Sequence, residues 1–182
     1  MDKIIRNGIK EILRAHEALL RIPVRRKARF EGWLKFELAH YLEEIGMENV
    51  EVECKAFYRR DRTDILFFND GEPYRLELKT PNTNWKLKGV NENCRPITKN
   101  VQSIIDDAKK LNSESGIVAF VLFPVPVGDS RWEIYLNRIN QKTGLALSKE
   151  ENCEILRVSI DDHNVCSVVV CAFMSKRFSS WP

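Results

Sequence analysis

Hydrophobic residues recur at helical spacing in three stretches of the chain. Residues 2–20 carry apolar side chains at i, i+4, i+7 and i+8 positions, which fall on one face of a helix. Residues 29–45 repeat this pattern and end before Gly46, a residue type that commonly terminates helices. Residues 99–112 show it again after Thr98, whose hydroxyl group can cap a first turn. The sequence therefore predicts three amphipathic helices.

Alternating or continuous apolar runs predict the strands. Residues 50–58 alternate, and residues 64–68 and 74–79 flank an Asn-Asp-Gly turn at 69–71, which is a strong hairpin signal. The apolar run 117–123 is typical of a strand covered on both faces. Three later segments are also predicted to be strands: 131–139, 154–160 and 165–174. From residue 29 the predicted order is helix, three strands, helix, strand, followed by C-terminal strands.

The composition is that of one globular domain, with 182 residues of which 43% are hydrophobic and 30% charged. Because the chain has no apolar run of about 18 residues and its charged start lacks a secretory apolar segment, we expect a cytoplasmic protein without a membrane partner. The five cysteines include no CxxC pair, which argues against a zinc or iron–sulfur site, and their odd number in an expected cytosolic chain predicts reduced thiols. The sequence also lacks the phosphate-loop, dinucleotide-binding and esterase motifs.

Positive charge is concentrated in one short segment. Residues 21–29 carry five basic residues and no acidic residue, although the formal net charge of the whole chain is only +3. The segment contains Pro23, which is expected to interrupt the first helix. Such a run is either an arm that contacts phosphates or a solvated connector between helices, and net charge alone does not distinguish the two.

The predicted hairpin brings two carboxylates together. If the Asp-Gly pair forms a two-residue turn, counting back along both strands places Asp64 directly opposite Glu77. Because side chains alternate along a strand, Lys79 shares this face, whereas Ile65 and Leu78 point to the core. A turn that is longer by one residue would change this register.

Facing carboxylates repel each other, at a cost of up to about 1 kcal/mol. A divalent cation that accepts one oxygen from each would remove this repulsion, and Mg²⁺ is suitable, with ligand distances of about 2.1 Å. Lys79 would then lie beside the metal, where it can hold a phosphate or an attacking hydroxide. The alternative is a surface charge cluster in which Lys79 partly neutralises both acids.

The element order and these residues resemble the PD-(D/E)XK nuclease superfamily, the restriction-endonuclease-like fold that archaeal Holliday-junction resolvases share. The motif stands here as Asp64 at the start of the second strand and Glu77-Leu78-Lys79 at the end of the third. A threonine precedes the motif aspartate, where the family name has proline. The resemblance covers residues 29–123 and implies an α/β fold whose central mixed sheet is flanked by helices.

The resemblance implies a single nuclease-like domain over residues 1–182. It divides the chain into an N-terminal helix and basic arm (1–28), a core (29–123) and a C-terminal strand extension (124–182). The implied function is hydrolysis of phosphodiester bonds, as a DNA endonuclease that uses Mg²⁺, with Mn²⁺ able to substitute. The alternative is a non-catalytic module on the same fold that binds nucleic acid or acts as a scaffold.

By the same resemblance, Asp64 and Glu77 ligate the metal, and the Leu78 carbonyl is a third protein oxygen. The superfamily also has a glutamate on the first core helix, which holds a second metal or a metal-bound water. Glu37 is the expected residue and Glu31 is the alternative, since both flank the apolar stripe. The motif lysine orients or deprotonates the attacking water, or steadies the phosphate. The expected catalytic residues are Glu37, Asp64, Glu77 and Lys79.

The expected partner is nucleic acid, with DNA favoured over RNA. Basic residues near the motif in the sequence could contact its phosphates. These are Arg25, Arg26, Lys27, Arg29, Arg59, Arg60 and Arg62. On the second core helix, Gln102 is the expected match for a polar residue that family members often carry near the site. The sequence is compatible with a monomer or a homodimer.

Overall fold

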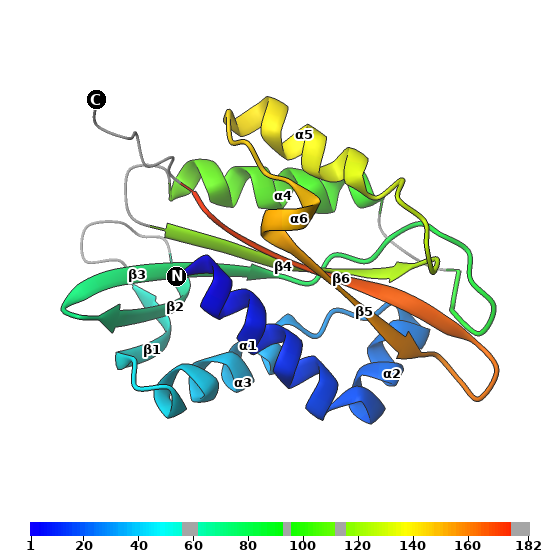
Figure 1. The fold of residues 1–182 in the computed structure, drawn as a ribbon, viewed down its shortest axis with the longest axis horizontal. Helices are drawn as coiled ribbons and strands as arrows, with labels where there is room; N and C mark the ends of the chain where they lie inside the picture. Colours follow the sequence, from blue (N-terminus) through cyan, green and yellow to red (C-terminus); the bar gives the residue numbers. More distant parts are fainter. Residues whose placement is uncertain (56–61, 93–95, 112–115, 176–182) are drawn as a thin grey trace.

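The structure is a computed structural model that describes residues 1–55, 62–92, 96–111 and 116–175. A six-stranded mixed sheet with the strand order β1-β2-β3-β4-β6-β5 forms its centre (Figure 1). The strands are β1 (Glu48–Lys55), β2 (Arg62–Asn69), β3 (Glu72–Lys79), β4 (Gly116–Val125), β5 (Cys153–Ser159) and β6 (Val165–Met174). In this sheet β3 and β4 run parallel, and every other neighbouring pair is antiparallel.

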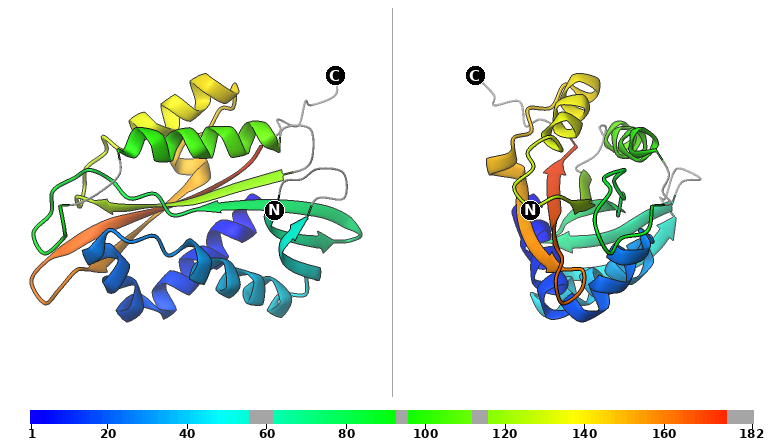
Figure 2. Two further views of the ribbon diagram at one scale, coloured as in Figure 1. Left: turned by 180° about the vertical axis from the view of Figure 1, so that it is seen from behind. Right: turned by 90° about the vertical axis from the view of Figure 1, so that its right-hand side faces the viewer.

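Helices cover both faces of the sheet, as the two views in Figure 2 show. They are α1 (Asp2–Ala15), α2 (Glu17–Arg26), α3 (Glu31–Glu44), α4 (Ile97–Lys110), α5 (Glu133–Thr143) and α6 (Lys149–Asn152). The first three lie on one face, and α4 and α5 lie on the other. Within the described residues, no helix is long and apolar enough to span a membrane.

Strand β4 separates two hydrophobic cores and contributes to both. All of its residues are buried, as the apolar run 117–123 predicts. Alternate side chains point to opposite faces of a strand. Ile117, Ala119 and Val121 therefore join the core under α1–α3, and Val118, Phe120 and Leu122 join the core under α4 and α5. The predicted order helix, three strands, helix, strand is present as α3, β1, β2, β3, α4 and β4.

The β2–β3 hairpin forms with the predicted turn. Asp70 and Gly71 have positive φ angles of 52° and 78°, which a two-residue type I′ turn requires. The two strands pair from Asn69–Glu72 back to Ile65–Leu76, so the predicted register is confirmed over these residues. The side chains of Ile65 and Leu76 are fully buried, as expected for the core-facing side.

The N-terminal helix differs from the prediction. It is interrupted at His16, and α2 then continues through Pro23 to Arg26. Most of the basic run is therefore helical and does not form an extended arm. Leu20 and Val24 are both fully buried one helical turn apart, and this packing offsets the hydrogen bond that proline cannot donate.

The segment 131–139 was predicted as a strand and is instead mostly helical, in α5. Trp132, Leu136 and Ile139 are buried at spacings of four and three residues against the second core. This is the period of a helix, and it overrides the strand-like local composition. The later strand predictions are confirmed as β5 and β6.

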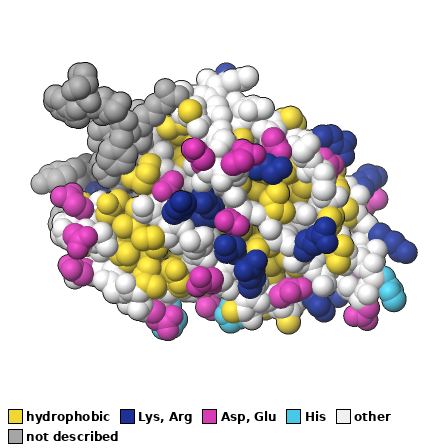
Figure 3. Space-filling view, in the orientation of Figure 1, with side chains coloured by type: hydrophobic (Ala, Val, Ile, Leu, Met, Phe, Trp, Pro, Cys, Tyr) yellow, Lys and Arg dark blue, Asp and Glu magenta, His cyan; other side chains and the backbone are white. Residues whose placement is uncertain are grey.

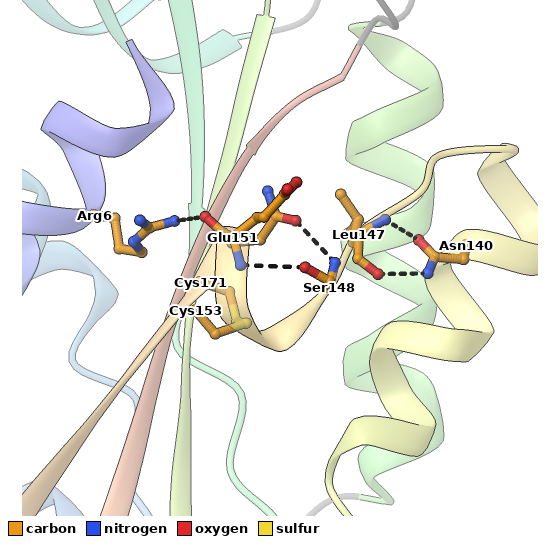
Figure 4. The surroundings of a disulfide bond; sticks show 8 residues. Arg6, Asn140, Leu147, Ser148, Glu151, Cys153 and Cys171 are labelled. Carbon is orange, nitrogen blue, oxygen red and sulfur yellow. Dashed lines mark hydrogen bonds between the residues drawn. A yellow bond between two sulfur atoms is a disulfide. The ribbon is translucent and has the colours of Figure 1, made fainter.

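A disulfide joins Cys153 of β5 to Cys171 of β6, which face each other in the antiparallel pair (Figure 4). The expectation of reduced thiols is therefore wrong for these two residues. Cys54 and Cys166 are free thiols, and burial raises the pKa of the Cys166 thiol to about 12. Cys94 lies outside the described residues.

Candidate active site

Asp64 lies where β2 and β3 stop pairing. The backbone ladder ends at the pair Ile65–Leu76, and two residues further along β3 the amide of Leu78 donates instead to Asp64 Oδ2 at 2.9 Å. The carboxylate therefore takes the place of a backbone acceptor. Its side chain is 16% exposed, so it is anchored at the point where the strands diverge while part of it faces solvent.

Lys79 links the two carboxylates that the hairpin predicts to be close. Its ammonium nitrogen lies 3.7 Å from Asp64 Oδ2 and 3.8 Å from Glu77 Oε2. It also donates to the carbonyl oxygen of Leu78 at 3.2 Å. The structure thus brings together the three motif side chains and the one backbone oxygen that the sequence singles out.

Glu77 is the most buried of the three motif residues with charged side chains, with 4% of the residue exposed. Burial raises its pKa to about 7, although a hydrogen bond from Lys110 opposes the shift. Lys110 Nζ lies 2.7 Å from Glu77 Oε1 and donates to the backbone oxygen of Arg62 at 2.8 Å. Sequence reasoning did not identify this lysine, which reaches the site from the end of α4.

Asp107, also on α4, is an acidic residue that sequence reasoning missed. Its Oδ2 lies 3.1 Å from Lys79 Nζ, and burial raises the pKa of its carboxyl group. Gln102 was the residue expected here, but its amide donates to Asp106 on the exposed side of the helix. Asp107 and Lys110 are three residues apart and so share one face of α4. Their spacing beside the buried stripe is the signal that could have indicated them.

The charge state of Lys79 follows from its neighbours. Burial alone would lower its pKa, but the charges of Asp107, Glu31 and Asp64 outweigh burial, and the pKa is raised. The side chain is therefore an ammonium cation at neutral pH. Of the roles that the sequence left open for this residue, holding an anion or orienting water suits a cation, whereas accepting a proton does not.

The glutamate of α3 that faces the site is Glu31. The charges of Lys79 and Asp64 act on its carboxyl group, whose pKa burial raises. Its Oε2 is buried and has no hydrogen-bond partner among the described residues. Glu31 lies at the first turn of α3, beside Thr80, the residue that follows the motif lysine.

Glu37, the preferred candidate from the sequence, is not part of this cluster, whereas the alternative, Glu31, is. Glu37 accepts a hydrogen bond from Trp33 Nε1 at 3.0 Å and lies 3.6 Å from His16 Nε2. It lies six positions after Glu31, which places the two side chains about 120° apart around the helix. One carboxylate therefore faces the motif, and the other faces the N-terminal helices.

Lys35, one turn after Glu31, is a further residue that sequence reasoning missed. Its ammonium nitrogen lies 3.3 Å from Asp64 Oδ1 and 2.8 Å from Glu53 Oε1. The lysine is 7% exposed. Glu53 occupies β1 with a positive φ of 54° and pairs with Lys35.

The basic residues of α2 divide into two groups. Arg25 and Arg26 are exposed. On the face of the molecule that Figure 3 shows, Lys and Arg side chains are interspersed with Asp and Glu side chains. Lys27 is 5% exposed and donates to the backbone oxygen of Trp85 at 3.0 Å. The structure therefore places the Lys27 side chain against the loop after β3 and not on the exposed surface where Arg25 and Arg26 lie.

Of the remaining basic candidates, the structure describes Arg29 and Arg62. Arg29 is exposed and donates to Asn100 Oδ1 at 3.0 Å, which ties the start of α3 to α4. Arg62 Nη1 lies 3.9 Å from Glu53 Oε2 at the rim. The predicted contacts at 59–60 lie outside the described residues.

The chemistry of the donor atoms suits a hard divalent cation. All are oxygens, from the carboxylates of Asp64, Glu77 and Glu31 and from the Leu78 carbonyl, and Glu31 contributes an acceptor that lacks a partner. Across the described ranges, however, no three His, Cys, Asp or Glu side chains converge on one metal position. Lysine ammonium groups contact the carboxylates instead, and Lys110 pairs with one of the two oxygens of Glu77, Oε1.

Comparisons of the chain with known protein families, curated proteins and solved structures find no match. The functional conclusion therefore depends on the geometry of this chain.

Proposed function

We propose that this protein is a metal-dependent nuclease of the PD-(D/E)XK type that hydrolyses phosphodiester bonds in DNA. The observation that carries the proposal is the convergence on Lys79 of acids from three elements. Asp64 comes from β2, Glu77 from β3 and Asp107 from α4, each with a carboxylate oxygen within 3.8 Å of the ammonium nitrogen. Glu31 of α3 adds a fourth negative charge.

The topology supports this proposal. In the superfamily resemblance, the aspartate opens the second strand, and the Glu-x-Lys pair closes the third, which is central in a mixed sheet. Here β2 pairs with β3 in antiparallel fashion, and β3 pairs with β4 in parallel, with α3 and α4 on opposite faces. The motif thus lies at the end of a strand that is flanked on both sides in the sheet.

Asp64, Glu77 and the Leu78 carbonyl would hold the metal ion, and Glu31 could hold a second ion or a water molecule. A bound Mg²⁺ would supply Lewis-acid polarisation of the phosphate and would lower the pKa of water. The polarisation would offset the repulsion between the phosphodiester anion and an attacking hydroxide, and the lower pKa of water would make hydroxide available near neutral pH.

Lys79 stabilises the negative charge that develops on the phosphate. It is held on several sides by Asp107 and the motif acids, so it needs little reorganisation when the substrate arrives. Because its pKa is raised, it donates hydrogen bonds and does not act as the base. Asp107 is a positioning residue, since it reaches the reacting groups only through Lys79.

Exposed basic side chains supply affinity for the nucleic-acid backbone. Arg25 and Arg26 project from α2, and Arg29 lies two residues before Glu31. Contacts of this kind are independent of base sequence. They favour a polyanionic substrate over a small phosphate ester.

The second candidate is a non-catalytic nucleic-acid-binding module on the same fold. The ion pair between Lys110 and Glu77, at 2.7 Å, favours it, because a lysine that permanently neutralised Glu77 would remove a metal ligand. Metal binding by the purified protein distinguishes the two candidates.

The direct test is cleavage of supercoiled plasmid and of branched DNA by the purified protein with Mg²⁺ or Mn²⁺. We expect nicking that chelation with EDTA abolishes and that Asp64→Asn reduces by at least about 100-fold. Asp106→Asn, an exposed acid on α4 beside Asp107, is the matched control and should cleave at the wild-type rate. Wild-type protein that binds DNA but never nicks it would support the binding module.

A further inference from the structure

Two lysines contact the carboxylates that the proposed function assigns to the metal. Lys110 Nζ lies 2.7 Å from Glu77 Oε1, and Lys35 Nζ lies 3.3 Å from Asp64 Oδ1. They come from α4 and α3, on opposite faces of the sheet. Neither is the motif lysine, so the site contains more positive charge than the proposed chemistry itself requires.

The formal charges of the side chains in the cluster nearly cancel. Its members are the carboxylates of Glu31, Asp64, Glu77 and Asp107 and the ammonium groups of Lys35, Lys79 and Lys110. These groups sum to a single negative charge, so one divalent cation would leave the partly buried site with a positive charge. A phosphodiester anion would return it to neutrality. Charge that is not balanced costs more free energy in a buried site than in water.

The two lysines differ in how freely they can move. The Lys110 side chain is 27% exposed and lies at the C-terminal end of α4, where a flexible four-carbon side chain can swing toward solvent. The Lys35 side chain is 9% exposed and is held by Glu53 as well as Asp64. Lys110 also has a second partner, since it donates to the backbone oxygen of Arg62 at 2.8 Å. The greater exposure of its side chain makes Lys110, rather than Lys35, the group that can leave its carboxylate.

We propose that Lys110 couples metal binding to nucleic-acid binding. Without substrate, its ammonium group pairs with the Glu77 carboxylate and weakens the affinity of the site for the metal ion. When a phosphodiester backbone is bound, Lys110 pairs with a phosphate, and Glu77 becomes available as a ligand. This inference rests on the proposed function and adds regulation to it, since the metal site is completed only in the presence of substrate.

Coupling between two ligands is reciprocal, so each must increase the affinity for the other by the same factor. Calorimetric titration with Mn²⁺ measures one side of this relationship. A short DNA duplex with phosphorothioate linkages supplies a charged backbone that resists cleavage, and the same duplex with methylphosphonate linkages supplies a neutral one. We expect the charged duplex to tighten Mn²⁺ binding by about 10-fold or more and the neutral duplex to leave it unchanged.

Lys110→Met should tighten Mn²⁺ binding to the free protein by about 5-fold or more and should largely remove the effect of the charged duplex. Lys110→Gln, which keeps a polar side chain, should behave in the same way and guards against a folding defect in the first variant. Lys109→Met is the matched control, because Lys109 is an exposed neighbour on the same helix. It should retain the wild-type coupling.

The outcomes separate the inference from the proposed function. If Mn²⁺ binding is the same in wild type and Asp64→Asn, no metal binds at the motif, and both are overturned. If Mn²⁺ binding depends on Asp64 but is unchanged by both Lys110 variants, with and without the charged duplex, only the coupling is overturned.

Discussion

Lys79 of β3 and Asp107 of α4 form an ion pair of 3.1 Å that joins the motif strand to the helix packed over it. Asp107 thereby fixes the ammonium group while Asp64 and Glu77 remain slightly farther from it, at 3.7 and 3.8 Å. The lysine is held mainly by an acid outside the motif. The two motif acids can therefore exchange partners without releasing it.

Lys79→Ala should slow cleavage by about 100-fold or more while metal binding persists, because one preorganised group at the transition state is worth about 2.7–4 kcal/mol. Plasmid nicking and Mn²⁺ calorimetry on the same preparation measure the two quantities. If the cluster is only structural, the variant will instead melt several degrees lower without metal, and the wild type will show no nicking.

Glu31→Gln and Glu37→Gln form a matched pair on one helix. We expect Glu31→Gln to reduce cleavage by about 10-fold or more, because it removes a negative charge that acts on Lys79. Glu37→Gln should retain wild-type activity, since its contacts are with Trp33 and His16. If Glu37→Gln instead cleaves more slowly than Glu31→Gln, Glu37 is the glutamate that takes part in cleavage, as the sequence analysis preferred.

The stability of the metal-free protein should fall as pH rises from about 5 to about 8. The folded state keeps the Glu77 proton up to a pKa of about 7, whereas the unfolded chain loses it near the ordinary glutamate pKa of 4.5. Folding therefore becomes less favourable across this window, by on the order of 3 kcal/mol for this group. Glu77→Gln cannot ionise, so its melting temperature relative to wild type should rise between pH 5 and pH 8. If the melting temperatures of Glu77→Gln and wild type, measured in EDTA, change in parallel with pH, the raised pKa of Glu77 is contradicted.

Arg25→Ala combined with Arg26→Ala should weaken DNA binding for every sequence tested and leave the melting temperature unchanged. The log–log slope of affinity against salt should flatten by up to about 0.9 for each lost phosphate contact. Lys27→Ala should do the reverse, with a lower melting temperature and an unchanged slope, because its ammonium group supports the Trp85 backbone. Fluorescence anisotropy at several salt concentrations and thermal melts distinguish the two results.

The hairpin could be predicted because its information is local. An Asn-Asp-Gly turn and two alternating strands set the register of Ile65 against Leu76, without any knowledge of the rest of the fold. The same reasoning placed Asp64, Glu77 and Lys79 together.

The choice between Glu31 and Glu37 was not local. Both flank the same apolar stripe, and their environments differ only because Trp33 and His16 engage one and Lys79 acts on the other. Tertiary partners decide such a question, and a helical pattern does not contain them.

The two residues that α4 contributes to the site could not be predicted either, because they also depend on tertiary contacts. Asp107 and Lys110 look like any acid and base on a solvated helix face until β3 is placed beneath them. The disulfide between Cys153 and Cys171 was equally unpredictable, since it depends on how β5 registers against β6. In α5, a short helix was mistaken for a strand because only three buried positions carry its period.

The hydrogen bond from the Leu78 amide to the Asp64 carboxylate has a practical consequence for any inactivated form of this protein. An alanine at this position would remove a proposed metal ligand and also leave the Leu78 amide without its acceptor. A loss of the proposed activity could then not be told apart from local unfolding of β3. Asparagine keeps an oxygen that can accept the bond. It is therefore the substitution to use when a catalytically dead but structurally intact protein is needed to trap bound substrate.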